Sequence, residues 1–219
     1  MARTQGSEGA RTEELIRRTA ISLIAIHGFE AITLRQLAEQ VGIQAGSIYR
    51  YFPSKGKLLA ALQTEHLEFL LSQWQEEFGG LRREKPWLEA SAKAKVLLAL
   101  RHFVAFHIRH HTLRRQEVFV ANMELRSLEA EDYKAVVGLR RRYEKILQGI
   151  LSEGALLGVF RVGLARARQS DIKVASFALL AMSLHRWFRS RDPPRSARRP
   201  PKPLGANRGP PCRPYFFLP

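Results

Sequence analysis

The stretch that decides the fold is residues 33–59, TLRQLAEQVGIQAGSIYRYFPSKGKLL. Its first part predicts a short buried helix, because Thr33 is a good N-cap and the apolar residues after it recur at helical spacing. Gly42 predicts the end of this helix, since glycine enters the left-handed conformation at little cost. Ile43 and Ile48 can then anchor a second short helix. The pattern is typical of a helix-turn-helix.

The second helix carries small and hydrogen-bonding side chains, which suit entry into the major groove of DNA. Gln44 can bond an adenine edge, Ala45 can meet a thymine methyl group, and Ser47 is permissive. Tyr49 and Lys55 fit phosphate contacts, although Tyr49 has the alternative of packing against the first helix. Thr33 and Arg35, at the start of the neighbouring helix, can contact the DNA backbone from the other side. The predicted DNA contacts are Thr33, Arg35, Gln44, Ala45, Ser47, Tyr49 and Lys55.

The run GIQAGSIYRYFPSK, residues 42–55, resembles the DNA-binding signature of TetR-family transcriptional regulators. Residues 16–34, with the closing phrase HGFEAIT, are similar to that family's first helix, so the likeness covers about the first quarter of the chain. It implies a helical ligand domain behind the reading head and a homodimer that reads a palindromic operator in double-stranded DNA. The alternative is a plain helical hairpin that touches no DNA.

Charge and composition point to the same class of partner. The 219 residues hold 36 Lys and Arg against 20 Asp and Glu, a net charge of +16 that favours nucleic acid. The single cysteine, Cys212, excludes an intramolecular disulfide and suits a reducing cytoplasm. We find no signal peptide and no apolar run near the ~20 residues that span a bilayer, so we expect a cytoplasmic protein with no membrane partner.

No strand-type alternation of any length occurs, so the expected fold is all-α. We expect a flexible arm over residues 1–10, a three-helix DNA-binding domain over 11–57, and a ligand-binding and dimerisation domain over 58–190. An Arg- and Pro-rich tail over 191–219 should be disordered. The expected longer helices are residues 11–27, 55–78, 92–110, 113–128 and 131–152, and a last one after Asp171.

The sensing half resembles one TetR subgroup at residues 122–128, 139–144 and 154–161. Members of that subgroup regulate lipid, steroid or aromatic-acid catabolism and answer to acyl-coenzyme A thioesters. The resemblance implies an apolar cavity for the acyl chain and cations for the coenzyme A phosphates. The candidate ligand contacts are Phe103, Phe106, Met123, Arg126, Arg161 and Trp187. The alternative is that the aromatic residues only fill the core and the arginines are solvated.

The chain offers no constellation of catalytic residues. His107 and His111 have the i, i+4 spacing of a helical metal site, but no nearby Asp, Cys or Glu completes a ligand set. A phosphate-binding glycine loop, a nucleophile elbow and a carboxylate pair for acid–base chemistry are all missing. We therefore predict no enzyme, no metal and no cofactor. Two other readings stay open: a constitutive DNA-binding protein without a ligand response and, less favoured, an all-α metalloenzyme built on the histidines.

The C-terminal segment departs from the family pattern, which continues after the helix ending near Trp187 into one more amphipathic helix. Residues 189–219 instead hold eight Lys and Arg against one acid, among many prolines. Our hypothesis is that the reading frame changed near Arg191. The alternative is a native basic tail that adds nonspecific DNA affinity. Either way, the dimer bundle lacks a helix that the family supplies.

Overall fold

The computed structural model describes residues 5–122, 125–161, 171–176 and 178–180. All regular elements in these ranges are helices, which confirms the all-α fold class. They are α1 Gln5–His27, α2 Leu34–Val41, η1 Ser47–Arg50, α3 Lys55–Leu81, α4 Lys85–Leu88, α5 Ala92–Leu113, α6 Arg115–Asn122, η2 Leu125–Ser127 and α7 Ala130–Leu156. Residues 171–176 and 178–180 are helical too.

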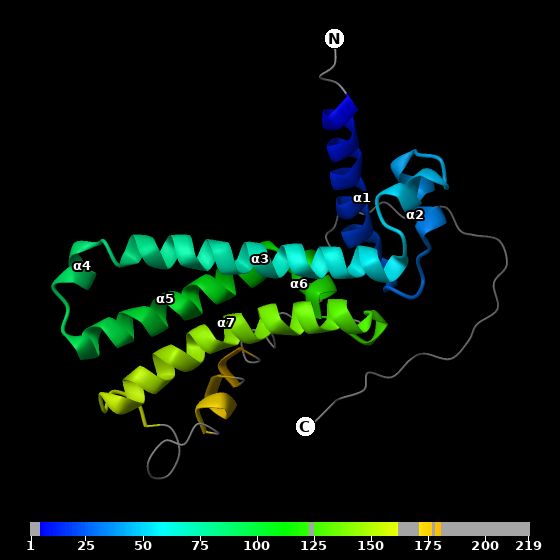
Figure 1. Ribbon diagram of the computed structural model, residues 1–219. Coiled ribbons are helices and arrows are strands. Elements are labelled where there is room, and N and C mark those ends of the chain that lie inside the picture. The colour runs from blue at the N-terminus through cyan, green and yellow to red at the C-terminus, as the bar shows by residue number, and fades with distance from the viewer. Residues whose placement is uncertain (1–4, 123–124, 162–170, 177, 181–219) are drawn as a thin grey trace.

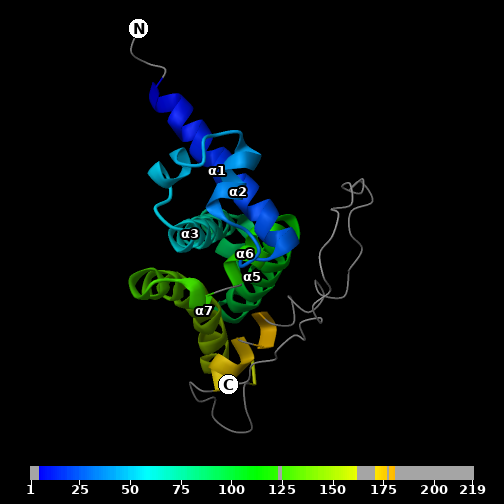
Figure 2. The same cartoon turned by 90° about the vertical axis from the view of Figure 1, so that its right-hand side faces the viewer.

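The long helix α3 runs through both halves of the molecule (Figure 1). At its N-terminal end α1, α2 and η1 gather into a small head, while α4 lies at its opposite end. Helices α5, α6 and α7 all pack against α3, with the most extensive contact made by α7. Viewed nearly along α3, the head lies on one side of this helix and α7 on the other (Figure 2). A movement of α3 would therefore carry the head with it.

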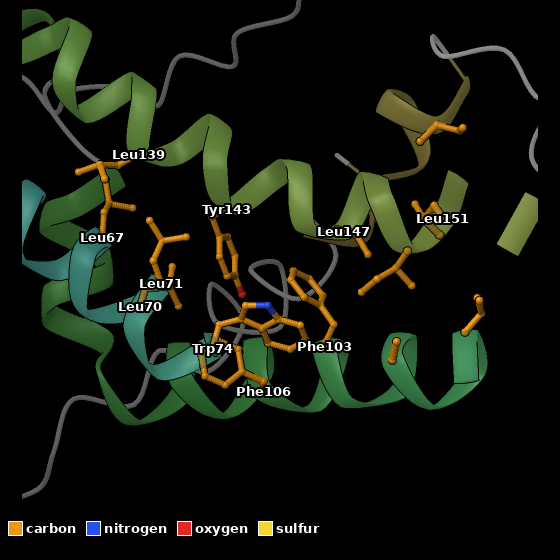
Figure 3. Close-up of a cluster of buried hydrophobic side chains, with 14 of the residues drawn as sticks. Leu67, Leu70, Leu71, Trp74, Phe103, Phe106, Leu139, Tyr143, Leu147 and Leu151 are labelled. Carbon is orange, nitrogen blue, oxygen red and sulfur yellow. The ribbon is translucent and has the colours of Figure 1, made fainter. Parts of the chain in front are cut away.

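Two hydrophobic cores hold these halves. The head core is built on Ile16, Ile24, Leu37, Ile48 and Leu58, none of them more than 1% exposed. The larger core lies between α3, α5 and α7, where aromatic rings meet edge to face (Figure 3). Such rings bury roughly 150–250 Å² each and dominate core energetics. Helix α6 serves both halves, because its Val120 belongs to the head core while the helix packs on α5 as well.

Several helices begin or end at residues other than those expected from the sequence. Helix α1 begins at Gln5, so the flexible arm predicted over residues 1–10 is wrong for residues 5–10. Glu8 in the first turn favours this early start, because an acidic side chain stabilises the positive end of the helix dipole. Helix α3 was expected to break at Gly79 but runs to Leu81. Gly79 and Gly80 each cost only about 1 kcal/mol in a helix, and the packing of the last turn outweighs that cost.

The second half contains similar adjustments. The connector over residues 81–91 holds the short helix α4, which begins beside Pro86. The helix expected over 113–128 divides into α6 and η2, and α7 continues past Gly154 to Leu156. The chain turns two residues later, at Gly158, whose φ of 67° is left-handed. Gly154 is needed for a different reason, since Phe160 folds back against it.

Several expectations lie outside the described residues. These are the Arg- and Pro-rich segment 191–219 and two of the candidate ligand contacts, Met123 and Trp187. The frame-change hypothesis therefore stays a prediction. Among the described residues, no helix is both long and apolar enough to cross a membrane.

Candidate nucleic-acid interface and effector site

Helix α2 is fixed at both ends by its own sequence. The Thr33 hydroxyl accepts a hydrogen bond from the Gln36 N–H at 3.2 Å, and the Gln36 side chain accepts one from the Thr33 N–H at 2.9 Å. This reciprocal pair is a capping box. At the other end Gly42 has a φ of 81°, and its N–H donates to the Glu39 carbonyl at 3.2 Å. The predicted cap and the predicted left-handed glycine are both confirmed.

The second element is shorter than expected, a 3₁₀ turn over Ser47–Arg50 rather than an α-helix. A hydrogen bond from the Ser47 N–H to the Gln44 carbonyl, 2.9 Å long, starts it. Ile48 is fully buried in the head core and fixes the turn from below. Tyr49 is 53% exposed, and Gln44 and Arg50 are exposed as well. One apolar anchor thus presents a row of polar side chains to solvent.

The side chains predicted to contact DNA bases and phosphates differ in their exposure and in the hydrogen bonds that they already make within the protein. Ala45 and Ser47 are half-buried beside the exposed Gln44 side chain. The Thr33 hydroxyl is engaged in the capping box, and it also donates to the Gln36 side chain at 2.9 Å. Arg35 is exposed and pairs with Glu39 at 3.4 Å. An exposed pair of this kind is weak, so Arg35 can exchange it for a phosphate.

Lys55, a predicted phosphate contact, already has partners within the protein. Its Nζ lies 4.2 Å from the centre of the Phe29 ring, 3.4 Å from the Glu30 carbonyl and 3.7 Å from the Glu30 carboxylate. These partners are 25 and 26 residues away in the chain, so local sequence gave no sign of them. Lys55 therefore ties the start of α3 to the loop before α2. To contact a DNA phosphate, the Lys55 ammonium group has to exchange these partners for it.

The head is joined to the larger core at the start of α3. Lys57 donates to Asp132 at 2.9 Å and lies 3.2 Å from the Glu129 carboxylate. Hydrogen bonds to these two acids, that to Asp132 first, raise the pKa of Lys57. Next to it, a Cβ on Gly56 would lie 3.2 Å from the Ser127 carbonyl, so this approach favours glycine. The start of α7 and the turn before it therefore contact the start of α3, where the DNA-binding head joins the larger core.

The histidines form a buried polar cluster between α3, α5 and α7. The His107 Nδ1 lies 3.1 Å from the Tyr143 hydroxyl, and the His111 Nδ1 lies 2.8 Å from the His107 carbonyl. Desolvation, then the charges of neighbouring cations, lowers the pKa of His66 to about 3 and that of His110 to about 4. These rings are therefore neutral at pH 7. In the described part of the chain, no three His, Cys, Asp or Glu side chains are grouped as a metal site requires.

The structure brings only some of the predicted ligand contacts together. Phe103 and Phe106 both pack on Trp74, with ring centres 5.1 and 5.5 Å from it, and both are buried core residues (Figure 3). Arg126 and Arg161 are exposed and lie at opposite ends of α7. A helix of 27 residues is about 40 Å long. One coenzyme A head group therefore cannot contact both arginines.

A groove of about 580 Å³ lies at the end of the molecule away from the head, between α3, α4, α5 and α7. Its aromatic wall is a chain of rings in which Phe78 stacks on Trp74 at 4.9 Å and meets Trp87 at 5.5 Å. Three cations, one acid and several aliphatic residues line the rest of it, among them Arg82, Lys95, Lys145, Glu153, Val96, Ile146 and Ile150. Sequence reasoning missed this groove because Trp74 and Phe78, four residues apart on a helix, read equally well as core.

Comparison with known families gives two matches that together cover most of the chain. Residues 16–62 match the family described as bacterial regulatory proteins, tetR family. Residues 98–193 match the tetracyclin repressor-like C-terminal domain. The second match ends near the point where the sequence becomes rich in Arg and Pro.

Individual relatives are similar over much of their length. The fatty acid metabolism regulator protein of Bacillus subtilis is 29% identical over 66% of this chain and 69% of its own. The transcriptional repressor KstR2 of Rhodococcus jostii is 28% identical over 85% of this chain and 83% of its own. A crystal structure of FadR from Bacillus subtilis in complex with stearoyl-CoA shares the fold, with a TM-score of 0.54, 24% identity and coverage of 80% and 88%.

Proposed function

The chain belongs to the TetR family of DNA-binding transcriptional repressors, and we propose that it is a homodimer that an acyl-coenzyme A thioester releases from a palindromic operator. Regulators of this family are not enzymes, and they bind operator DNA and effector ligands. Beyond these family properties, we propose the chemical class of the effector, the dimer, the residues that contact DNA and effector, and action in the cytoplasm.

The observation that carries the DNA-binding part is the row of exposed side chains on a buried anchor. Gln44, Tyr49 and Arg50 face solvent, while Ile48 is fully buried. Burial of Ile48 fixes the position of the turn, so the three polar side chains stay available for DNA. A glutamine amide can bond an adenine edge, and the tyrosine and arginine can hold phosphates. Thr33, Arg35, Ala45, Ser47 and Lys55 complete the proposed interface.

This interface is tested by selecting operator sequences from random DNA and measuring affinity by fluorescence anisotropy. Gln44→Ala should weaken the selected operator by about 1–3 kcal/mol per head and relax base preference at one position. Tyr49→Phe should weaken all sequences alike. The matched control is Gln75→Ala, an exposed glutamine about 30 Å along α3, which should change nothing. Equal affinities for Gln44→Ala and Gln75→Ala would refute the assignment.

The groove between α3, α4, α5 and α7 supports the acyl-coenzyme A part. Its volume of about 580 Å³ is in the range of small-molecule sites, and it combines an apolar wall with three cations. This combination suits an apolar chain that carries phosphates. The stearoyl-CoA complex of the fold relative FadR motivates the same ligand class. Here the proposed contacts are Trp87, Lys95 and Lys145 rather than the buried rings of Phe103 and Phe106.

The effector is tested by titrating stearoyl-CoA, with free coenzyme A as the control, and following tryptophan fluorescence. Binding should quench the emission of wild-type protein, and Trp87→Leu should reduce the quenching. Lys95→Met with Lys145→Met should weaken the thioester at least tenfold, which is about 1.4 kcal/mol. If the thioester binds no better than coenzyme A and leaves operator affinity unchanged, the constitutive DNA-binding protein without a ligand response becomes the better account.

The dimer follows from the small area of one head. A single reading head buries too little surface for useful specificity, and two heads related by a two-fold axis read two half-sites. Val174, in the helical residues after α7, is 69% exposed and can contribute apolar surface to such a contact. Light scattering should give about twice 25.0 kDa. A monomeric mass would refute the dimer.

A further inference from the structure

Arg140 on α7 is a cation without a counter-ion among the described residues. Its Nη1 donates to the Asn122 side-chain oxygen at 3.2 Å. Its Nε and Nη2 have essentially no contact with solvent, and neither has a hydrogen-bond partner in the part of the chain that the structure describes. Burial lowers the pKa of the Arg140 side chain. A guanidinium that is buried without a partner is rare in folded proteins, because desolvation of the charge is unfavourable.

The acidic neighbours of Arg140 do not neutralise it. Glu144 lies one turn further along α7, but it forms no ion pair with Arg140 and its carboxylate accepts instead from the Gln148 side chain at 2.8 Å. Asn122 is neutral and supplies one oxygen only. On α3, His66 is close enough for the charge of Arg140 to depress its protonation, and this ring is neutral. In the described part of the chain, Arg140 is therefore hydrogen-bonded by Asn122 but ion-paired by no carboxylate.

The free edge of the guanidinium has a specific shape. Nε and Nη2 are neighbouring donors in one plane, and this pair matches the two oxygens of a carboxylate or of a phosphate side by side. The opposite corner, Nη1, is already held by Asn122, which fixes the plane. An ammonium group could not present such a fork, so an arginine held in this way indicates a planar or tetrahedral oxyanion.

We propose that Arg140 binds an anionic group, a carboxylate or a phosphate, through Nε and Nη2 in a site on α7 that Asn122 orients. The site is distinct from the groove lined by Trp87 and Lys95, which does not include Arg140. The anion comes either from a free carboxylic acid or from the phosphates of a coenzyme A thioester. The proposal does not depend on acyl-coenzyme A being the effector, because the unpartnered edge accepts either source.

The test is thermal unfolding of the full chain in acetate, inorganic phosphate, decanoate and decanoyl-CoA, each compared with chloride at equal ionic strength. At about ten times its dissociation constant, a bound anion should raise the Tm by about 3–6 °C. The shift in acetate, phosphate and decanoate should vanish in Arg140→Met and shrink in Arg140→Lys, whereas decanoyl-CoA should lose only part of its shift, because the groove of Trp87 and Lys95 binds the thioester independently. The shift should persist in Arg141→Met, which removes an exposed neighbour on the same helix. A response to acetate and decanoate identifies a carboxylate, and one to phosphate and decanoyl-CoA identifies a phosphate.

Asn122→Asp gives an independent variant. A carboxylate at position 122 would supply the missing counter-ion, so this variant should lose the anion-dependent shift, whatever stability it loses with the hydrogen bond from Asn122 Nδ2 to the Val118 carbonyl. Equal shifts in wild type and Arg140→Met for all four anions would overturn the proposal. So would an Asn122→Asp variant that still responds to anions as the wild type does. Operator affinity, measured separately, reports on the proposed function and stands apart from these outcomes.

Discussion

The buried histidines make stability strongly dependent on pH, and His66 with His107 gives the clearest case. Both rings are less than 10% exposed, and desolvation is the main reason that the pKa of each falls from 6.5 to about 3. Repulsion from the neighbouring His110 and His111 rings, when these are protonated, acts in the same direction. Two bases are therefore kept neutral in the fold at pH values where they would be protonated in water.

The sign and size of the effect follow from linkage. Below pH 6.5 the unfolded chain binds protons that the folded chain does not, so stability is complete above pH 6.5 and falls as the pH drops towards 3. Each such proton costs about 1.4 kcal/mol per pH unit, and the loss from pH 7 to pH 5 is about 2 kcal/mol for each histidine. The pair therefore loses about 4 kcal/mol, a large part of the ~5–15 kcal/mol that stabilises a typical domain.

The assay is urea unfolding followed by tryptophan fluorescence at pH 7, 6 and 5 and constant ionic strength. The wild-type midpoint should fall steeply across this range, and His66→Gln combined with His107→Gln should reduce the slope, while His110 and His111, whose pKa values are also lowered, retain part of it. His27→Gln is the matched control, because His27 is exposed at the end of α1 and its replacement should leave the slope unchanged. A midpoint that does not move between pH 7 and 5, or a double variant with the wild-type slope, would refute the reasoning.

Three further variants test the packing that holds the head and the core. Thr33→Ala removes the capping box and should cost about 0.5–2 kcal/mol, seen as a lower Tm by circular dichroism; an unchanged Tm would contradict the cap. Ile48→Ala should cost about 2–5 kcal/mol and weaken operator binding. Limited proteolysis should then cut the head of this variant, and a head as resistant as that of wild type would argue against Ile48 as its anchor. Gly154→Ala should cost about 1–3 kcal/mol, because the new methyl group meets the Phe160 ring. Gly149→Ala, in the same helix with open space around it, is the control for the last variant in the same urea assay and should gain about 0.5–1 kcal/mol, because alanine favours the helix over glycine.

The head was predictable because its determinants are local. The cap at Thr33 and the left-handed Gly42 each act within four residues, and both appear in the structure where the sequence places them. The 3₁₀ form of Ser47–Arg50 was not predictable, because a turn this short depends on how Ile48 fits into the head core.

The rest of the candidate site depends on partners far apart in the chain. Lys57 meets Asp132 across 75 residues, and nothing around either residue signals this pair. The resemblance to acyl-coenzyme A regulators drew attention to Phe103, which the structure places in the core, while Trp87 in a charged connector lines the groove. Helical periodicity cannot distinguish an aromatic residue that fills a core from one that lines an opening, because both face the same way along the helix.

The most direct test of the account is to titrate stearoyl-CoA into a preformed complex of the full chain with its selected operator and follow the anisotropy of labelled DNA. The account predicts that the thioester releases the operator in a saturable way, that free coenzyme A does not, and that Lys95→Met with Lys145→Met shifts the release to higher thioester concentration. An operator that stays bound at saturating thioester would contradict the claim that this protein is an acyl-coenzyme A-responsive repressor.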